Sequence, residues 1–194
     1  MLHRICLTLV VSITLFANTS RAEVEIYERR SEYRYETERG TSKRWHVSCA
    51  HKVQGKGKGT RFCDLELTSG EYFMGSPQTE IGGVTVTVGV YATRTGRSRE
   101  FAVRIGRWAD DKSVAKIVLG KNEFSKIVDY NRRVEWRGAD GLPVIREFIS
   151  AKSARYELVR DRTREAEKFT LLGFANAWAY AVNFVQFDPI QEAN

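Results

Sequence analysis

The segment from residue 45 to residue 67 carries the densest set of side chains that could do chemistry. It holds two of the three cysteines in the 194-residue chain, Cys49 and Cys63, and two of the three histidines, His46 and His51. Thiols and imidazoles so arranged support a structural disulfide, a redox-active pair or a metal site. The cysteine spacing is far from C-x-x-C, which argues against a redox-active pair.

The residues around each cysteine alternate as in β-strands, and this alternation favours the disulfide over the metal. Each cysteine shares a strand face with two apolar residues, Trp45 and Val47 beside Cys49, and Leu65 and Leu67 beside Cys63. His46 falls on the face opposite Cys49, where it could not share a metal ion with that sulfur. We therefore predict a disulfide between Cys49 and Cys63, buried beneath a hairpin, and neither a metal ion nor another cofactor. Closing a loop of about 15 residues contributes about 3 kcal/mol in the chain-entropy model.

The connection between these strands is rich in glycine and lysine. Lysines beside exposed backbone N–H groups can hold anions, so the candidate anion-binding residues are Lys52, Lys56, Lys58 and Arg61. The loop is not a P-loop, and it has no aromatic residue on which a base could stack, so we expect no specific nucleic-acid binding. The alternative, which we favour, is a solvated hairpin tip kept soluble by its charges.

No pattern of catalytic residues is evident. The chain lacks a G-x-S-x-G motif, and its best serine contexts, Ser48 and Ser69, have no evident partner. Asp110-Asp111 is typical of a polar turn, and the charged stretch 160–165 is typical of a hairpin loop. We predict that the protein is not an enzyme. An enzyme or enzyme inhibitor with a site assembled from scattered residues stays open as an alternative.

Period-2 alternation dominates the rest of the chain and predicts a mainly β fold. The clearest strands, 84–93 and 99–106, form a predicted hairpin, and further strands are expected at 115–119, 124–129, 132–136, 154–160 and 167–172. Two helices are expected, one opening at Asp140–Pro143 and ending at Lys152, the other running from Gly173 to Val185. We therefore predict an antiparallel β-sandwich or open barrel with two short helices in the C-terminal half, covering one end.

Residues 1–22 are typical of a secretory signal peptide, with a short basic start, an apolar stretch and small residues before Ala22. A retained membrane anchor is the alternative. Residues 23–43 then form a charged N-terminal arm or edge strand, and residues 44–194 a single β-rich domain. Cleavage would leave no membrane-spanning segment and would lower the net charge from +7 to +5, with 29 basic and 24 acidic residues. These features predict a periplasmic, secreted or outer-surface location, where a disulfide is stable.

The order of motifs resembles the invasion-associated locus B family of bacterial envelope proteins. The resemblance lies in Trp45, Cys49 and Cys63 near the start and in the run Leu172-Gly-Phe-Ala175 near the end. It implies a β-rich periplasmic, surface-associated or secreted protein linked to host-cell invasion. It also implies a Cys49–Cys63 disulfide and structural roles for Trp45, Gly173 and Phe174, and it carries over no catalytic residue.

These observations predict an exported, non-enzymatic binding or adaptor protein of the bacterial cell envelope. Its partner would be an envelope or host-surface protein, or an anionic polymer. The alternative is a protein that binds anionic envelope or host polymers through the basic loop 51–61. The net charge supports attraction to such polymers, although acidic and basic residues are interspersed along the chain.

Overall fold

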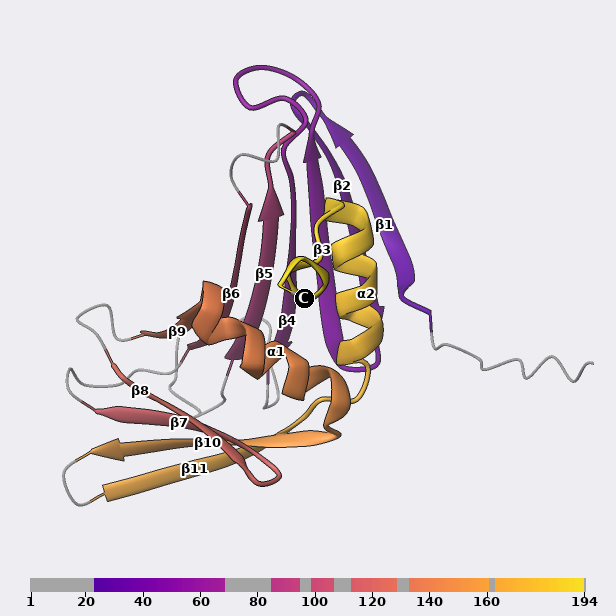
Figure 1. The fold of residues 1–194 in the computed structure, drawn as a ribbon. Coiled ribbons are helices and arrows are strands. Elements are labelled where there is room, and N and C mark those ends of the chain that lie inside the picture. Colours follow the sequence, from indigo (N-terminus) through magenta and orange to yellow (C-terminus); the bar gives the residue numbers. More distant parts are fainter. Residues whose placement is uncertain are drawn as a thin grey trace, which may run out of the picture.

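The computed structural model describes residues 23–68, 85–94, 99–106, 113–128, 133–160 and 163–193. Within these residues the chain forms two antiparallel sheets, with short helices in the C-terminal half (Figure 1). In the part of the chain that the structure describes, neither sheet closes into a barrel. The prediction of a mainly β, antiparallel fold with late helices is confirmed.

The larger sheet has seven strands in the described part of the chain. In spatial order they are β1 (Glu25–Glu32), β2 (Tyr35–Ser42), β3 (Trp45–Lys52), β4 (Arg61–Thr68), β5 (Thr85–Ala92), β6 (Arg99–Gly106) and β9 (Arg133–Arg137). The smaller sheet has the order β11 (Thr163–Thr170), β10 (Ser153–Arg160), β7 (Val114–Leu119) and β8 (Asn122–Ile127). The helical elements are η1 (Gly138–Asp140), α1 (Gly141–Ser150), α2 (Phe174–Val185) and α3 (Pro189–Glu192).

Helices α1 and α2 lie against one face of the larger sheet, which we call the inner face (Figure 1). Helix α2 buries residues at helical spacing, namely Phe174, Ala177, Trp178, Ala181 and Val185. Its small residues let it lie close over β3 and β4. The matching inner face of the sheet carries the valines of β5 and the apolar residues of β3 and β4.

A chain of aromatic contacts joins the two sheets into one core. The ring of Trp45 on β3 lies 4.8 Å from that of Phe174 on α2, centroid to centroid. Phe174 contacts Phe148 of α1 at 5.4 Å, and Phe148 contacts Phe169 of β11 at 6.1 Å. Edge-to-face and tilted pairs of this kind stabilise beyond the area they bury. The two helices therefore fill the space where the sheets meet.

One predicted segment differs in detail from the structure. Strand β11 starts at Thr163 rather than at 167, and Arg160 still belongs to β10. The predicted hairpin loop 160–165 was therefore too long, because β11 lies at a sheet edge, where charged residues are compatible with strand structure. The N-terminal segment forms the hairpin β1–β2, with β1 at the edge of the larger sheet.

Several sequence predictions fall on residues outside the described ranges. These are the signal peptide at 1–22, Ser69 and the Asp110-Asp111 turn. Among the described residues, no helix is long and apolar enough to cross a membrane.

Candidate functional site

The disulfide lies at the centre of the inner face. Cys49 on β3 is paired directly with Cys63 on β4, and the two residues are bonded with their Cα atoms 4.1 Å apart. Both are buried, and the Sγ atom of Cys63 lies 3.8 Å from the carbonyl oxygen of Ala181 on α2. The predicted bridge is confirmed. Because the sulfurs bond each other, neither is a thiolate ligand, and His46 lies exposed on the opposite face.

Two residues along the strands from the disulfide, the register aligns three basic residues and one alanine across four strands. His51 of β3 pairs with Arg61 of β4, Arg61 with Ala92 of β5, and Ala92 with Arg99 of β6. These four residues share the inner face with the cysteines, since each lies two residues along its strand from an inner-face position. Helix α2 ends at Val185, above this row. The row therefore forms one end of the inner face.

A pocket with a volume of about 540 Å³ lies at this end. Its basic lining residues are His51, Lys58, Arg61, Arg94 and Arg99. Ala92 and Val185 contribute an apolar part of the lining, and Gln186 contributes an amide. The side chains come from β3, β4, the β3–β4 loop, β6 and the residues after β5, so the larger sheet positions most of the pocket.

Neighbouring groups hold several of these basic side chains. Arg61 Nη1 donates a hydrogen bond to the carbonyl oxygen of Phe184 at 3.1 Å, near the end of α2. Arg99 pairs with Glu192 of α3, and its guanidinium lies 5.5 Å from the ring centroid of Phe187. These contacts attach both guanidinium groups to the C-terminal part of the chain.

The remaining contacts around the pocket involve one carboxylate and one glycine. Nδ1 of His51 lies 3.6 Å from a carboxylate oxygen of Glu36 on β2. Arg94 packs against Gly59, where an added Cβ atom would lie 2.6 Å from the Cβ of Arg94. Gly59 has a φ of +86°, so this backbone conformation and the close packing both favour glycine. Glycine at this position therefore gives Arg94 its place in the pocket lining.

The β3–β4 loop uses its own amides to form turns. Lys58 donates its N–H to the carbonyl of Gly55 at 3.1 Å, Gly59 to Lys52 at 2.7 Å, and Thr60 to Gly57 at 3.1 Å. These three N–H groups are engaged within the loop, so the loop offers side chains rather than these amides to an anion.

The structure separates the four predicted anion-binding residues. Lys58 and Arg61 line the pocket. Nζ of Lys52 instead lies 5.6 Å from the ring centroid of Tyr35, and Lys56 is exposed in the loop outside the pocket lining. Sequence reasoning missed Arg94 and Arg99 as site residues. Arg94 follows the first strand of the predicted hairpin and Arg99 begins the second, but this position alone does not place either residue beside β4.

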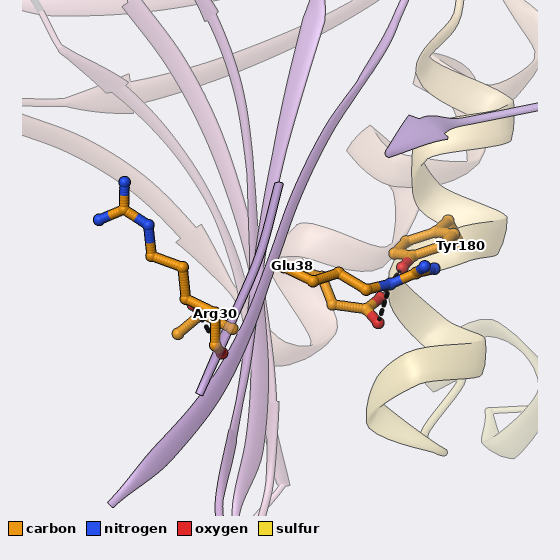
Figure 2. A network of polar contacts seen from close by, with 5 residues as sticks. Arg30, Glu38 and Tyr180 are labelled. Atoms are coloured by element: carbon orange, nitrogen blue, oxygen red, sulfur yellow. Dashed lines mark hydrogen bonds and ion pairs between the residues drawn. The ribbon is translucent and has the colours of Figure 1, made fainter. Parts of the chain in front are cut away.

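A network of polar contacts connects the β1–β2 hairpin to α2. The hydroxyl of Tyr180 donates to Glu38 Oε2, and Nε of Arg29 donates to Glu38 Oε1 at 3.0 Å. Figure 2 shows Glu38 and Tyr180 facing each other, while Arg30 points away on the other side of the hairpin. Burial and the hydrogen bond to Glu38 raise the pKa of Tyr180, so the tyrosine stays protonated and keeps donating. This network connects β1 and β2 to α2, which is a structural role.

The opposite face of the larger sheet carries a second group of charges. Burial raises the pKa of the Asp64 carboxyl, despite the opposing attraction of Arg104. Burial acts the same way on Glu135, but hydrogen bonds from Arg137 and Arg104 outweigh it and lower the pKa of Glu135. These residues lie on the far side of the sheet from the pocket.

The basic pocket is thus the candidate site that the described residues support best. Arginine and lysine side chains stay protonated near neutral pH, so they bind negative charge rather than transfer protons. No family model, no curated protein and no solved structure matches this chain.

Proposed function

We propose that this protein is an exported, non-enzymatic binding protein of the bacterial cell envelope whose basic pocket receives an anionic ligand. The observation that carries the proposal is the convergence of four basic side chains, Lys58, Arg61, Arg94 and Arg99, on one pocket. Focused positive charge attracts anionic partners and speeds their association.

The location in the envelope is supported by two observations. Residues 1–22 have the pattern of a secretory signal peptide. The Cys49–Cys63 disulfide is compatible with an oxidising compartment. The resemblance to the invasion-associated locus B family supports the same location and extends the proposal to a role in host-cell invasion. The partner in that case is an envelope or host-surface component that bears anionic groups.

Binding rather than catalysis is supported by the chemistry of the pocket. Its charged residues are arginines and a lysine, which fix and neutralise anions. Its one imidazole, that of His51, lies beside the carboxylate of Glu36. This set of side chains matches recognition of an oxyanion.

The test uses two loop lysines that differ in position but not in charge. The processed protein is applied to immobilised lipopolysaccharide and to heparin at low and high salt, as wild type, Lys58→Gln and Lys56→Gln. We expect Lys58→Gln to weaken binding about fivefold to tenfold, because a pocket contact to an anion is lost. Lys56→Gln should stay within about twofold of wild type, since Lys56 lies outside the pocket lining.

Equal losses in the two variants would show that the loop acts only through its total charge. Failure of the wild type to bind either polymer or any phosphorylated probe at low salt would refute anion binding altogether.

A further inference from the structure

The pocket has two basic walls, the first formed by Arg61 and the second by Arg99. The small residue Ala92 lies between them. Arg61 on β4 and Arg99 on β6 flank Ala92 on β5, as the register requires. Neighbouring strands lie about 4.8 Å apart, so the Cα atoms of the two arginines are roughly 10 Å apart. Lys58 lies in the loop leading to β4, and Arg94 lies in the segment that follows β5. Ala92 leaves space between the walls that a larger side chain would fill.

The second wall already binds a carboxylate of the protein itself. Arg99 pairs with the carboxylate of Glu192, the last residue of α3. A guanidinium carries five N–H donors, so an arginine held at one nitrogen can still donate from the others to a ligand. The Glu192 carboxylate therefore shows the kind of group that this wall accepts.

Charge and size limit what can fill the pocket. One lysine and three arginines line it and Glu192 pairs with one of them, which leaves a formal charge of about +3. A phosphate group carries about −1.5 to −2 charges at neutral pH, so two phosphates match the pocket better than one. The volume of about 540 Å³ falls within the range typical of small-molecule sites.

Building on the proposed function, we propose that the pocket binds a sugar-sized ligand carrying two phosphate groups, one against each wall. Such a group occurs both in free sugar bisphosphates and in the phosphorylated disaccharide headgroup of lipopolysaccharide. Binding at the second wall requires the ligand to compete with Glu192 for Arg99.

The proposal predicts a preference that titration calorimetry can measure. The processed protein is titrated with inorganic phosphate, glucose monophosphate and glucose bisphosphate. We expect the bisphosphate to bind at least about tenfold more tightly than the monophosphate, because the second phosphate gains its own charge-assisted contacts. Arg99→Gln should remove this preference, while Lys121→Gln, which removes a charge from the β7–β8 turn outside the pocket lining, should keep it.

A second variant tests the same wall without removing its arginine. Glu192→Gln frees Arg99 from its carboxylate partner and should tighten bisphosphate binding while leaving monophosphate binding nearly unchanged. Equal affinities for the two sugar phosphates in the wild type would overturn the two-phosphate proposal and leave anion binding intact. Loss of all binding to phosphorylated probes and to the polymers would instead overturn the proposed function.

Competition by lipopolysaccharide identifies the source of the ligand. If lipopolysaccharide displaces the bisphosphate and its dephosphorylated form does not, the headgroup is a ligand of the pocket. If neither form competes while the free bisphosphate binds with the expected preference, the ligand is a soluble sugar bisphosphate. Both results support two-phosphate recognition.

Discussion

Asp64 is a carboxyl group whose ionised form the fold disfavours. It lies on the outer side of β4, where its Oδ1 would be 3.0 Å from a Cβ atom added at Gly89 of β5. Burial raises its pKa above the ordinary value of 3.8, and the nearby Arg104 offsets only part of this effect. The folded protein therefore holds an unfavourable charge at neutral pH.

This charge predicts a pH-dependent effect of Asp64→Asn. Above the raised folded pKa the wild type carries a penalty that asparagine lacks, so the variant should unfold at higher urea concentration. Below pH 3.8 the carboxyl is protonated in both folded and unfolded chains, so the advantage should disappear. Urea denaturation across this pH range measures the difference. Asp140→Asn, at an exposed carboxyl, is the control, and an advantage of Asp64→Asn that grows toward low pH would contradict the argument.

Residue-scale features were predictable where the pattern was local. The faces of Cys49 and Cys63 follow from alternation within two short strands, so the disulfide could be predicted from the sequence. The roles of Lys56 and Lys58 could not be separated, since both occur in the same glycine-rich loop and only the folded turns place Lys58 at the pocket. Arg99 enters the site through pairing of β4, β5 and β6, which no local pattern reveals.

At the scale of elements, the position of α2 depends on Gly173, the residue before the helix. Its φ is +94°, and an added Cβ atom would lie 2.3 Å from the carbonyl oxygen of Ser42 at the end of β2. Neither the backbone conformation nor the contact tolerates a side chain. Helix α2 therefore begins where the chain passes directly over the β2–β3 turn.

Gly173→Ala should destabilise the protein by about 2 kcal/mol or more, because it combines a strained backbone with a clash. Gly120→Ala is the matched control, since Gly120 also has a positive φ, +60°, but an added Cβ atom there would meet no atom within 4 Å. The free energy of unfolding of Gly120→Ala should fall by only about 1 kcal/mol. Thermal or urea unfolding of both proteins provides the comparison. Equal losses would mean that the contact with Ser42 contributes nothing.

Elements with strong periodicity lie close to their predicted positions. Helix α2 spans Phe174–Val185 against a prediction of 173–185, and β5 and β6 form the predicted hairpin. Strand β11 was predicted too short because its first residues are charged. A run of charged residues argues against a strand that is buried inside a sheet. In an edge strand such residues are common.

At the scale of the whole molecule, the arrangement of the sheets was beyond local pattern. Strand β6 pairs with β9, and β7 pairs with β10, so each sheet contains segments separated by other elements. Alternation predicts that a segment is a strand, but it does not choose the strand's neighbours. The class of fold could therefore be predicted, whereas the two-sheet topology and the pocket that depends on it could not.

The proposed removal of residues 1–22, together with the Cys49–Cys63 disulfide, predicts that protein recovered after export has the mass of residues 23–194 less two hydrogens. Intact-mass measurement on protein recovered after export, with and without reduction, checks both the cleavage and the disulfide. A mass that includes residues 1–22 would contradict cleavage. A mass that does not change on reduction would contradict oxidation in the exported form.

The pairing of Cys49 with Cys63 also makes strand register chemically detectable. The two residues lie directly opposite each other on the inner face, and a slip of one residue would turn one of them to the other face. Within a formed hairpin, a one-residue slip therefore prevents the bond from closing. Among folded chains kept under oxidising conditions, free thiols would therefore mark molecules with a misaligned hairpin, and an alkylating reagent would label those molecules permanently.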